Sequence, residues 1–148
     1  IKAFAIEKVV LFGDSLMAGY GLPNEHHLSV VLEQRLKDQG KNIKVINGSV
    51  SGSTSSGGLN RAEWSLSDED IDLMILGLGA NDMLRGIPPN ETEQNLEKII
   101  KIAQSKNIKV ILAGMLDHVV IRLLGIIFEM LRHHNQLYPI PFHASSVL

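Results

Sequence analysis

A serine that could act as a nucleophile, Ser15, follows an apolar run near the start of the chain. The run from Val9 to Phe12 is rich in β-branched residues and predicts a buried strand. Gly13 permits a sharp exit, so Ser15 would lie at the carboxyl end of that strand, where open α/β sheets place their ligands. This placement favours nucleophilic attack by the serine hydroxyl. The surroundings are not a G-x-S-x-G elbow, because no glycine stands two residues before Ser15.

Two later segments, residues 47–52 and 79–82, also follow an apolar run and break it with glycine. Three parallel strands would therefore present Ser15, Gly52 and Asn81 at one edge of a sheet. A hydroxyl, a backbone N–H and a side-chain amide are the nucleophile and oxyanion donors that acyl transfer needs. The alternatives are a flexible Gly/Ser linker over residues 48–58 and a simple turn at residues 81–82. We favour functional loops, because each segment follows an expected strand.

These blocks resemble those of the SGNH hydrolases, also called GDSL esterases and lipases. Within that family they resemble the branch of small bacterial arylesterases and multifunctional thioesterase/lysophospholipases. The sequence Gly13-Asp14-Ser15-Leu16 is similar to the first family block, Gly52 to the second, and Gly79-x-Asn81-Asp82 to the third. The resemblance runs from about residue 7 to about residue 115. It implies Ser15 as the catalytic nucleophile, with the N–H groups of Ser15 and Gly52 and the amide of Asn81 as the oxyanion hole.

The order of apolar runs predicts an α/β fold, a three-layer α/β/α sandwich around a parallel sheet. The resemblance implies its flavodoxin-like SGNH hydrolase form. Strands are expected at residues 9–12, 43–47, 73–76 and 108–113, and helices at residues 28–39 and 59–64. A further helix should run from a cap at Asn90 or Thr92 to about residue 106. In the first helix, Glu33 and Lys37 are spaced for an ion pair, and Gly40 is placed to end the helix.

The pattern changes after Met115. The segment from Val119 to Leu131 is nearly all apolar, yet it is too short and too interrupted for a membrane span. The family's last block, Asp-x-x-His, supplies the acid and the general base, and it is not present. Residues 6–148 are therefore expected to form a single domain that is family-like to about residue 115 and divergent or shortened beyond it. His143 is the candidate base, because it follows an expected strand at residues 138–142; Asp117-His118 is a second candidate pair.

Composition sets further bounds. A chain of 148 residues with 45% hydrophobic and 20% charged residues is ordinary for one globular domain. The formal net charge of −2 offers no basic surface for nucleic acid. The absence of cysteine excludes disulfides and thiol catalysis. No cofactor is implied, and no metal site is expected, because the histidines lack ligand spacing with supporting carboxylates.

The first residues predict export. Ala3-Phe4-Ala5 has the small-x-small pattern of a signal-peptidase site, so residues 1–5 are interpreted as the remnant of a signal peptide or leader. A weakly ordered leader is the alternative. Export is also usual in the family branch that the sequence resembles. We therefore expect a periplasmic or secreted protein, with the cytoplasm as the other option.

The predicted function is that of a serine esterase. It would hydrolyse short-chain acyl or aryl esters, or thioesters, through an acyl-enzyme on Ser15, with impaired activity if the usual Asp and His are lost. The alternatives are a non-catalytic ligand-binding or interaction module on the same fold, and a carbohydrate deacetylase. The expected partner is a small-molecule ester, with no nucleic acid and no stable membrane insertion. Self-association is a further possibility, because a shortened sheet would leave an edge or a face uncovered.

Overall fold

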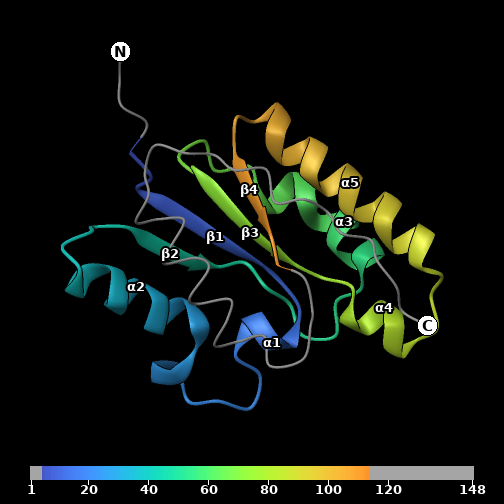
Figure 1. Ribbon diagram of the computed structural model, residues 1–148, viewed down its shortest axis with the longest axis horizontal. Coiled ribbons are helices and arrows are strands. Elements are labelled where there is room, and N and C mark those ends of the chain that lie inside the picture. Colours follow the sequence, from blue (N-terminus) through green and yellow to red (C-terminus); the bar gives the residue numbers. More distant parts are fainter. Residues whose placement is uncertain (1–4, 114–148) are drawn as a thin grey trace. The chain divides into compact units, whose positions relative to one another are not determined.

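The computed structural model describes residues 5–113, within the first of two units into which the chain divides, residues 1–117. Four strands form a parallel sheet in the order β2-β1-β3-β4 (Figure 1). They are β1 (Lys8–Gly13), β2 (Lys44–Asn47), β3 (Leu73–Gly77) and β4 (Lys109–Leu112). The four strands predicted within residues 5–113 are present, and the sheet with its connecting helices confirms the predicted α/β fold.

Helices connect the strands and cover both faces of the sheet. They are α1 (Ser15–Ala18), the 3-10 turn η1 (Asn24–His26), α2 (Leu28–Asp38), α3 (Ser55–Ser65), α4 (Ala80–Leu84) and α5 (Pro89–Ser105). Helix α2 lies on one side of the sheet, and α3 and α5 lie on the other (Figure 1). Val10 and Phe12 of β1 belong to the core cluster that includes Ala62 of α3 and Ile99 of α5. Successive side chains of a strand alternate between faces, so the equally buried Val9 and Leu11 face the opposite layer.

Helix α3 begins at Ser55, so the prediction that it starts at Leu59 is wrong. The Thr54 side chain accepts the N–H of Gly57 at 3.1 Å and caps the helix. Gly58 lies inside α3, where a Cβ would collide with Leu78 Cδ1. Gly57 and Gly58, which indicate a loop in the sequence, therefore lie in the first turns of α3. Gly58 permits close packing against Leu78.

The start of α5 also differs from the expectation. The helix begins at Pro89 with Pro88 as the preceding cap residue, so neither Asn90 nor Thr92 caps it. Proline suits the first turn because its missing N–H would have no helical partner there. The Thr92 hydroxyl instead donates to Asp82 Oδ1 at 3.2 Å. This contact joins α5 to the short helix α4, which is not predicted by the sequence.

The expected ion pair between Glu33 and Lys37 on α2 is not formed. Glu33 Oε2 accepts the backbone N–H of Val45 at 2.7 Å instead. Strand β2 lies at an edge of the sheet, and an edge strand has backbone groups without a partner strand. The carboxylate therefore covers one of these groups. Gly40 ends the helix as predicted, with a positive φ of 75°.

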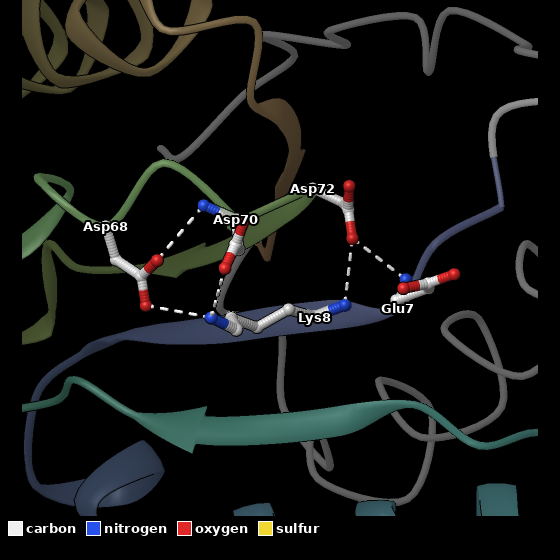
Figure 2. Close-up of polar contacts among 5 residues, drawn as sticks. All are labelled: Glu7, Lys8, Asp68, Asp70 and Asp72. Atoms are coloured by element: carbon white, nitrogen blue, oxygen red, sulfur yellow. Dashed lines mark hydrogen bonds and ion pairs between the residues drawn. The ribbon is translucent and has the colours of Figure 1, made fainter.

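The amino ends of β1 and β3 are fixed by carboxylates (Figure 2). Asp72 Oδ2 accepts the backbone N–H groups of Glu7 and Lys8 at 2.8 and 2.9 Å. The Lys8 ammonium group lies 2.9 Å from Asp68 Oδ2 and 3.7 Å from Asp70 Oδ2. These contacts support the register that pairs Val9 with Leu73 and, at the other end of the strands, Gly13 with Gly77.

Several predictions lie outside the described residues. They are residues 1–4 of the leader expected at residues 1–5, the candidate base His143, the pair Asp117-His118, the apolar segment at 119–131 and the strand at 138–142. The predicted export of the protein stays a prediction. Within residues 5–113, no helix is both long and apolar enough to cross a membrane.

Removing the Asp72 carboxylate should destabilise the fold. We expect Asp72→Ala to lower the free energy of unfolding by about 1.5–3 kcal/mol, because two backbone N–H groups lose a charged acceptor. Urea denaturation measures this change. Asp70→Ala is the matched control, because its carboxylate is 85% exposed and makes only the longer ion pair with Lys8. Equal effects of the two substitutions would show that Asp72 does not fix the strand register.

Candidate active site

The carboxyl ends of β1, β2 and β3 lead into three segments that hydrogen bonds hold together. The Gly48 N–H donates to Leu11 O at 2.9 Å, which continues the pairing of β1 and β2 past the end of β2. The Val50 N–H donates to Gly13 O at 3.0 Å. Asn81 Nδ2 donates to Ser53 O at 3.1 Å, which ties the segment after β3 to the segment after β2. The structure thus brings together the segments that carry Ser15, Gly52 and Asn81.

Ser15 is the first residue of the short helix α1. Asp14 precedes it as the cap residue, and Asp14 Oδ1 accepts the Leu16 N–H at 3.0 Å. Gly13 makes the close approach to β3 possible, because a Cβ at this position would lie 2.7 Å from Gly77 O. The Ser15 side chain is partly exposed, and within residues 5–113 its hydroxyl has no hydrogen-bond partner. The hydroxyl is therefore open to a ligand.

Gly52 occupies an exposed turn with a positive φ of 77°, which favours glycine. The turn is closed by the Ser53 N–H, which donates to Val50 O at 3.1 Å. Arg85 Nη2 donates to the Gly52 carbonyl at 3.1 Å. The Gly52 N–H itself has no acceptor among residues 5–113. The turn is held at its carbonyl, which leaves its N–H available as a donor.

Asn81 lies in the first turn of α4, directly after Gly79 and Ala80. Besides its bond to Ser53 O, Asn81 Nδ2 lies 3.5 Å from Asp14 Oδ2. The first contact holds one amide proton firmly. The second is at the long limit of a hydrogen bond and leaves the other proton weakly engaged. The contact with Asp14 places the Asn81 amide beside the segment that contains Ser15.

Asp82 forms a buried network that holds α4 in place. Its carboxylate is 1% exposed and accepts the Ser55 N–H at 2.8 Å, the Ser55 hydroxyl at 2.5 Å and the Thr92 hydroxyl. Asn95 Nδ2 donates to Ser55 Oγ at 3.0 Å. The network joins α3, α4 and α5 beneath Asn81. Sequence reasoning missed it, because an aspartate that follows an asparagine after glycine is also typical of a turn.

The site holds a second buried carboxylate, that of Asp14, which is 3% exposed. Burial raises the pKa of Asp14, because the charged form loses its hydration. The hydrogen bond from the Leu16 N–H opposes this rise, and the nearby Asp82 carboxylate adds to it. The carboxylate beside the Ser15 turn is thus held in surroundings that favour its protonated form.

The described histidines do not complete a triad with Ser15. His26 is exposed, and a ring nitrogen of His27 lies 3.1 Å from Leu22 O. Neither ring bonds the Ser15 hydroxyl. In the part of the chain that the structure describes, no three His, Cys, Asp or Glu side chains gather in a way that could hold a metal ion.

The pH dependence of stability should reveal the Asp14 carboxyl. Because its folded-state pKa is raised above the ordinary value of 3.8, the stabilisation that it gives is present below that pH and is lost as pH rises through the folded-state pKa. We compare urea denaturation of the native chain and Asp14→Asn from pH 3.5 upward. The free energy of unfolding of the native chain should fall relative to that of Asp14→Asn as pH rises. A difference that stays constant with pH would contradict the assignment.

Known esterases are similar to this chain in sequence and in structure. An arylesterase of Vibrio mimicus is 41% identical over 108 residues, which cover 73% of this chain and 54% of the relative. Esterase TesA of Pseudomonas aeruginosa is 38% identical over 111 residues, which cover 75% of this chain and 55% of the relative. The crystal structure of AlinE4, an SGNH-hydrolase family esterase, matches with a TM-score of 0.70 and 35% identity, over 86% of this chain and 71% of that one.

The chain spans about half the length of the curated relatives that it matches, 54% and 55% for these two. The family match itself is longer than the resemblance noted in the sequence. It runs over residues 11–138 and includes all three blocks. The chain therefore belongs to the GDSL-like lipase/acylhydrolase family.

Proposed function

We propose that the protein is a serine esterase that hydrolyses carboxylic esters or thioesters through an acyl-enzyme on Ser15. One observation carries this proposal. The segments after β1, β2 and β3 are hydrogen-bonded to one another at one edge of the sheet. They present a serine hydroxyl and a glycine N–H that have no partner within residues 5–113, and a weakly engaged asparagine amide. The names of the relatives, an arylesterase and an esterase, agree with this chemistry.

The reaction would proceed in two steps. A general base takes the Ser15 proton as Ser15 Oγ attacks the ester carbonyl carbon, and the carbonyl oxygen becomes an oxyanion. The N–H groups of Ser15 and Gly52 and the Asn81 amide hold that oxyanion as the alcohol or thiol leaves. Water then attacks the acyl-enzyme and releases the acid. Donors that are fixed before the reaction begins are effective, because they need no reorganisation as charge develops.

In this proposal, the general base is one of residues 114–148, which the structure does not describe. Residues 114–148 contain four of the six histidines: His118, His133, His134 and His143. We assign the role to His143, because it follows the apolar segment at residues 138–142. A chain that lacked a working base would keep weak activity, since the oxyanion hole and substrate binding alone give some catalysis over water.

The proposed substrates carry an apolar acyl or aryl group. Exposed apolar side chains come from the same segments as the site: Leu16 of α1 is 58% exposed, Val50 beside Gly52 is 50% exposed, and Leu84 of α4 is 78% exposed. Each could cover a short acyl chain or an aromatic ring and remove its surface from water. Three such side chains offer a limited apolar area, which is the reason for proposing short-chain or aryl substrates.

Hydrolysis of p-nitrophenyl acetate and butyrate tests the proposal. We expect turnover by the native chain, loss of that turnover in Ser15→Ala, and a decrease in kcat of about 10²–10³-fold in Asn81→Ala, because one oxyanion donor is removed. Loss of activity in His143→Ala would identify the base. Activity that persists in His143→Ala would place the base elsewhere.

The control for Asn81→Ala is Asn60→Ala, which replaces an exposed asparagine on α3. It should leave kcat unchanged. If the native chain hydrolyses these esters no faster than Ser15→Ala, the esterase proposal is wrong. The chain would then be a non-catalytic binding module of the family.

A further inference from the structure

A partly buried arginine on α3, Arg61, contacts the two loops that carry the proposed nucleophile and oxyanion donor. Arg61 Nη1 donates to Gly48 O at 2.7 Å, and Arg61 Nη2 donates to Gly13 O at 3.1 Å. Gly13 ends β1 two residues before Ser15, and Gly48 begins the loop that leads to Gly52. One guanidinium group therefore bridges the main chains of β1 and β2 where each strand ends.

The surroundings of Arg61 indicate that packing alone does not explain an arginine at this position. Its guanidinium carbon lies 3.9 Å from the centroid of the Phe12 ring, so the charge sits against the apolar core. Within residues 5–113 no carboxylate pairs with it, and its buried Nε has no acceptor. Partial burial of a cation without a counter-ion costs free energy that an apolar side chain would not. The cation–π contact with Phe12 and the two carbonyl contacts compensate for this cost, and only the carbonyl contacts reach the strand ends.

We propose that Arg61 is a positioning residue that sets the distance between the Ser15 turn and the Gly52 turn. It does so by holding the carbonyls of Gly13 and Gly48 in its rigid planar fork. The inference rests on the proposed acyl-transfer function, because this distance matters for catalysis only if both turns bind the same oxyanion.

The bonding around Gly13 explains how the effect reaches Gly52. Gly13 O accepts both Arg61 Nη2 and the Val50 N–H, so its two lone pairs are used. Val50 also begins the turn that contains Gly52, because Val50 O accepts the Ser53 N–H. Arg85 holds the Gly52 carbonyl from the other end of the loop. Loss of Arg61 would therefore weaken the attachment of the first half of this loop, which would keep only the N–H bonds of Gly48 and Val50 to β1, while the second half keeps its bond to Arg85.

Amide hydrogen exchange of the full chain tests the positioning role directly. The variants are Arg61→Met, which keeps much of the apolar bulk, Arg61→Lys, which keeps the charge, and Arg35→Met as the control on an exposed surface of α2. In Arg61→Met we expect the Val50 and Ser53 amides to exchange about tenfold faster or more, while the β3 amides of Met74 and Leu76 change less. Arg61→Lys should show a smaller increase, because one ammonium group can still hold one carbonyl. Arg35→Met should show none.

Kinetics supply the second readout. We normalise rates to the fraction of chain whose Ser15 reacts with an alkylphosphonate, so that misfolded protein does not count. In Arg61→Met, kcat should fall by about 10–100-fold, because a displacement of about 1 Å in a catalytic group costs about that much. KM should stay within about threefold, because the lost contact supports the transition state rather than ground-state binding. Arg61→Lys should recover part of kcat.

Two results would overturn the inference. One is an Arg61→Met variant whose Val50 exchange and normalised kcat match those of the native chain. The other is an increase in exchange that is equal in the Val50 loop and in β3, which would indicate a packing role only. If Arg61→Met does not fold, Arg61→Lys provides the test, by the same comparison of the amide exchange rate of Val50 with the rates in β3. If no variant shows Ser15-dependent hydrolysis, the proposed function fails, and the exchange data still show whether Arg61 orders the loop.

Discussion

The parallel pairing of β1 with both of its neighbours is the constraint on which the rest of the structure depends. Its register places Leu11 opposite Asn47 of β2 and Gly13 opposite Gly77 of β3. Because both neighbours run in the same direction as β1, the segments that follow all three strands leave the sheet at the same edge. A shift of one residue in β1 would turn its core side chains to the wrong face and separate Ser15 from Asn81. Contacts at the amino ends of the strands therefore help to determine the geometry of the site at their carboxyl ends.

The site is built from buried polar groups that a simple core would not contain. Asp14 and Asp82 are carboxylates with 3% and 1% exposure, and Arg61 is a partly buried cation without a carboxylate partner in the described residues. Each of these three side chains forms a hydrogen bond with a main-chain group: Asp14 with the Leu16 N–H, Asp82 with the Ser55 N–H, and Arg61 with Gly13 O. Such groups cost stability relative to apolar packing, and they give the loops a defined conformation. The arrangement is what a preorganised oxyanion site requires, because its donors must be oriented before substrate arrives.

Much of this architecture could be predicted from the sequence. The four strands and the helix α2 follow from apolar runs and helical periodicity, and the alternation of strands and helices predicts a parallel sheet. The order of the three glycine-broken segments indicated which segments would lie together at the carboxyl ends of the strands. The start of α3 could not be predicted, because Gly57 and Gly58 have the composition of a loop, while the need for glycine comes from the position of Leu78 in the folded chain. The start of α5 differed from the prediction because the helix begins at Pro89, and the Thr92 hydroxyl donates to Asp82 of α4 instead of capping the helix.

The positioning contacts were beyond sequence reasoning for the same physical reason. Arg61 lies on an ordinary helical segment, and nothing in its neighbours indicates that its side chain reaches two strand ends. Arg85 follows Asn81 closely in sequence, yet its bond to Gly52 O depends on the path of a loop 33 residues away. Both contacts use main-chain carbonyls as acceptors, and every residue type supplies a carbonyl, so no pattern of side chains marks them.

The most direct test is a crystal structure of the full chain after reaction with a p-nitrophenyl alkylphosphonate. Ser15 would displace p-nitrophenolate from phosphorus, and the resulting adduct mimics the tetrahedral intermediate. The account predicts a covalent bond from phosphorus to Ser15 Oγ. It also predicts one phosphonate oxygen within hydrogen-bond distance of the Gly52 N–H and the Asn81 amide. Modification of another residue, or a phosphonyl group on Ser15 whose oxygens contact neither Gly52 nor Asn81, would contradict the central claim that the three strand ends form one oxyanion site.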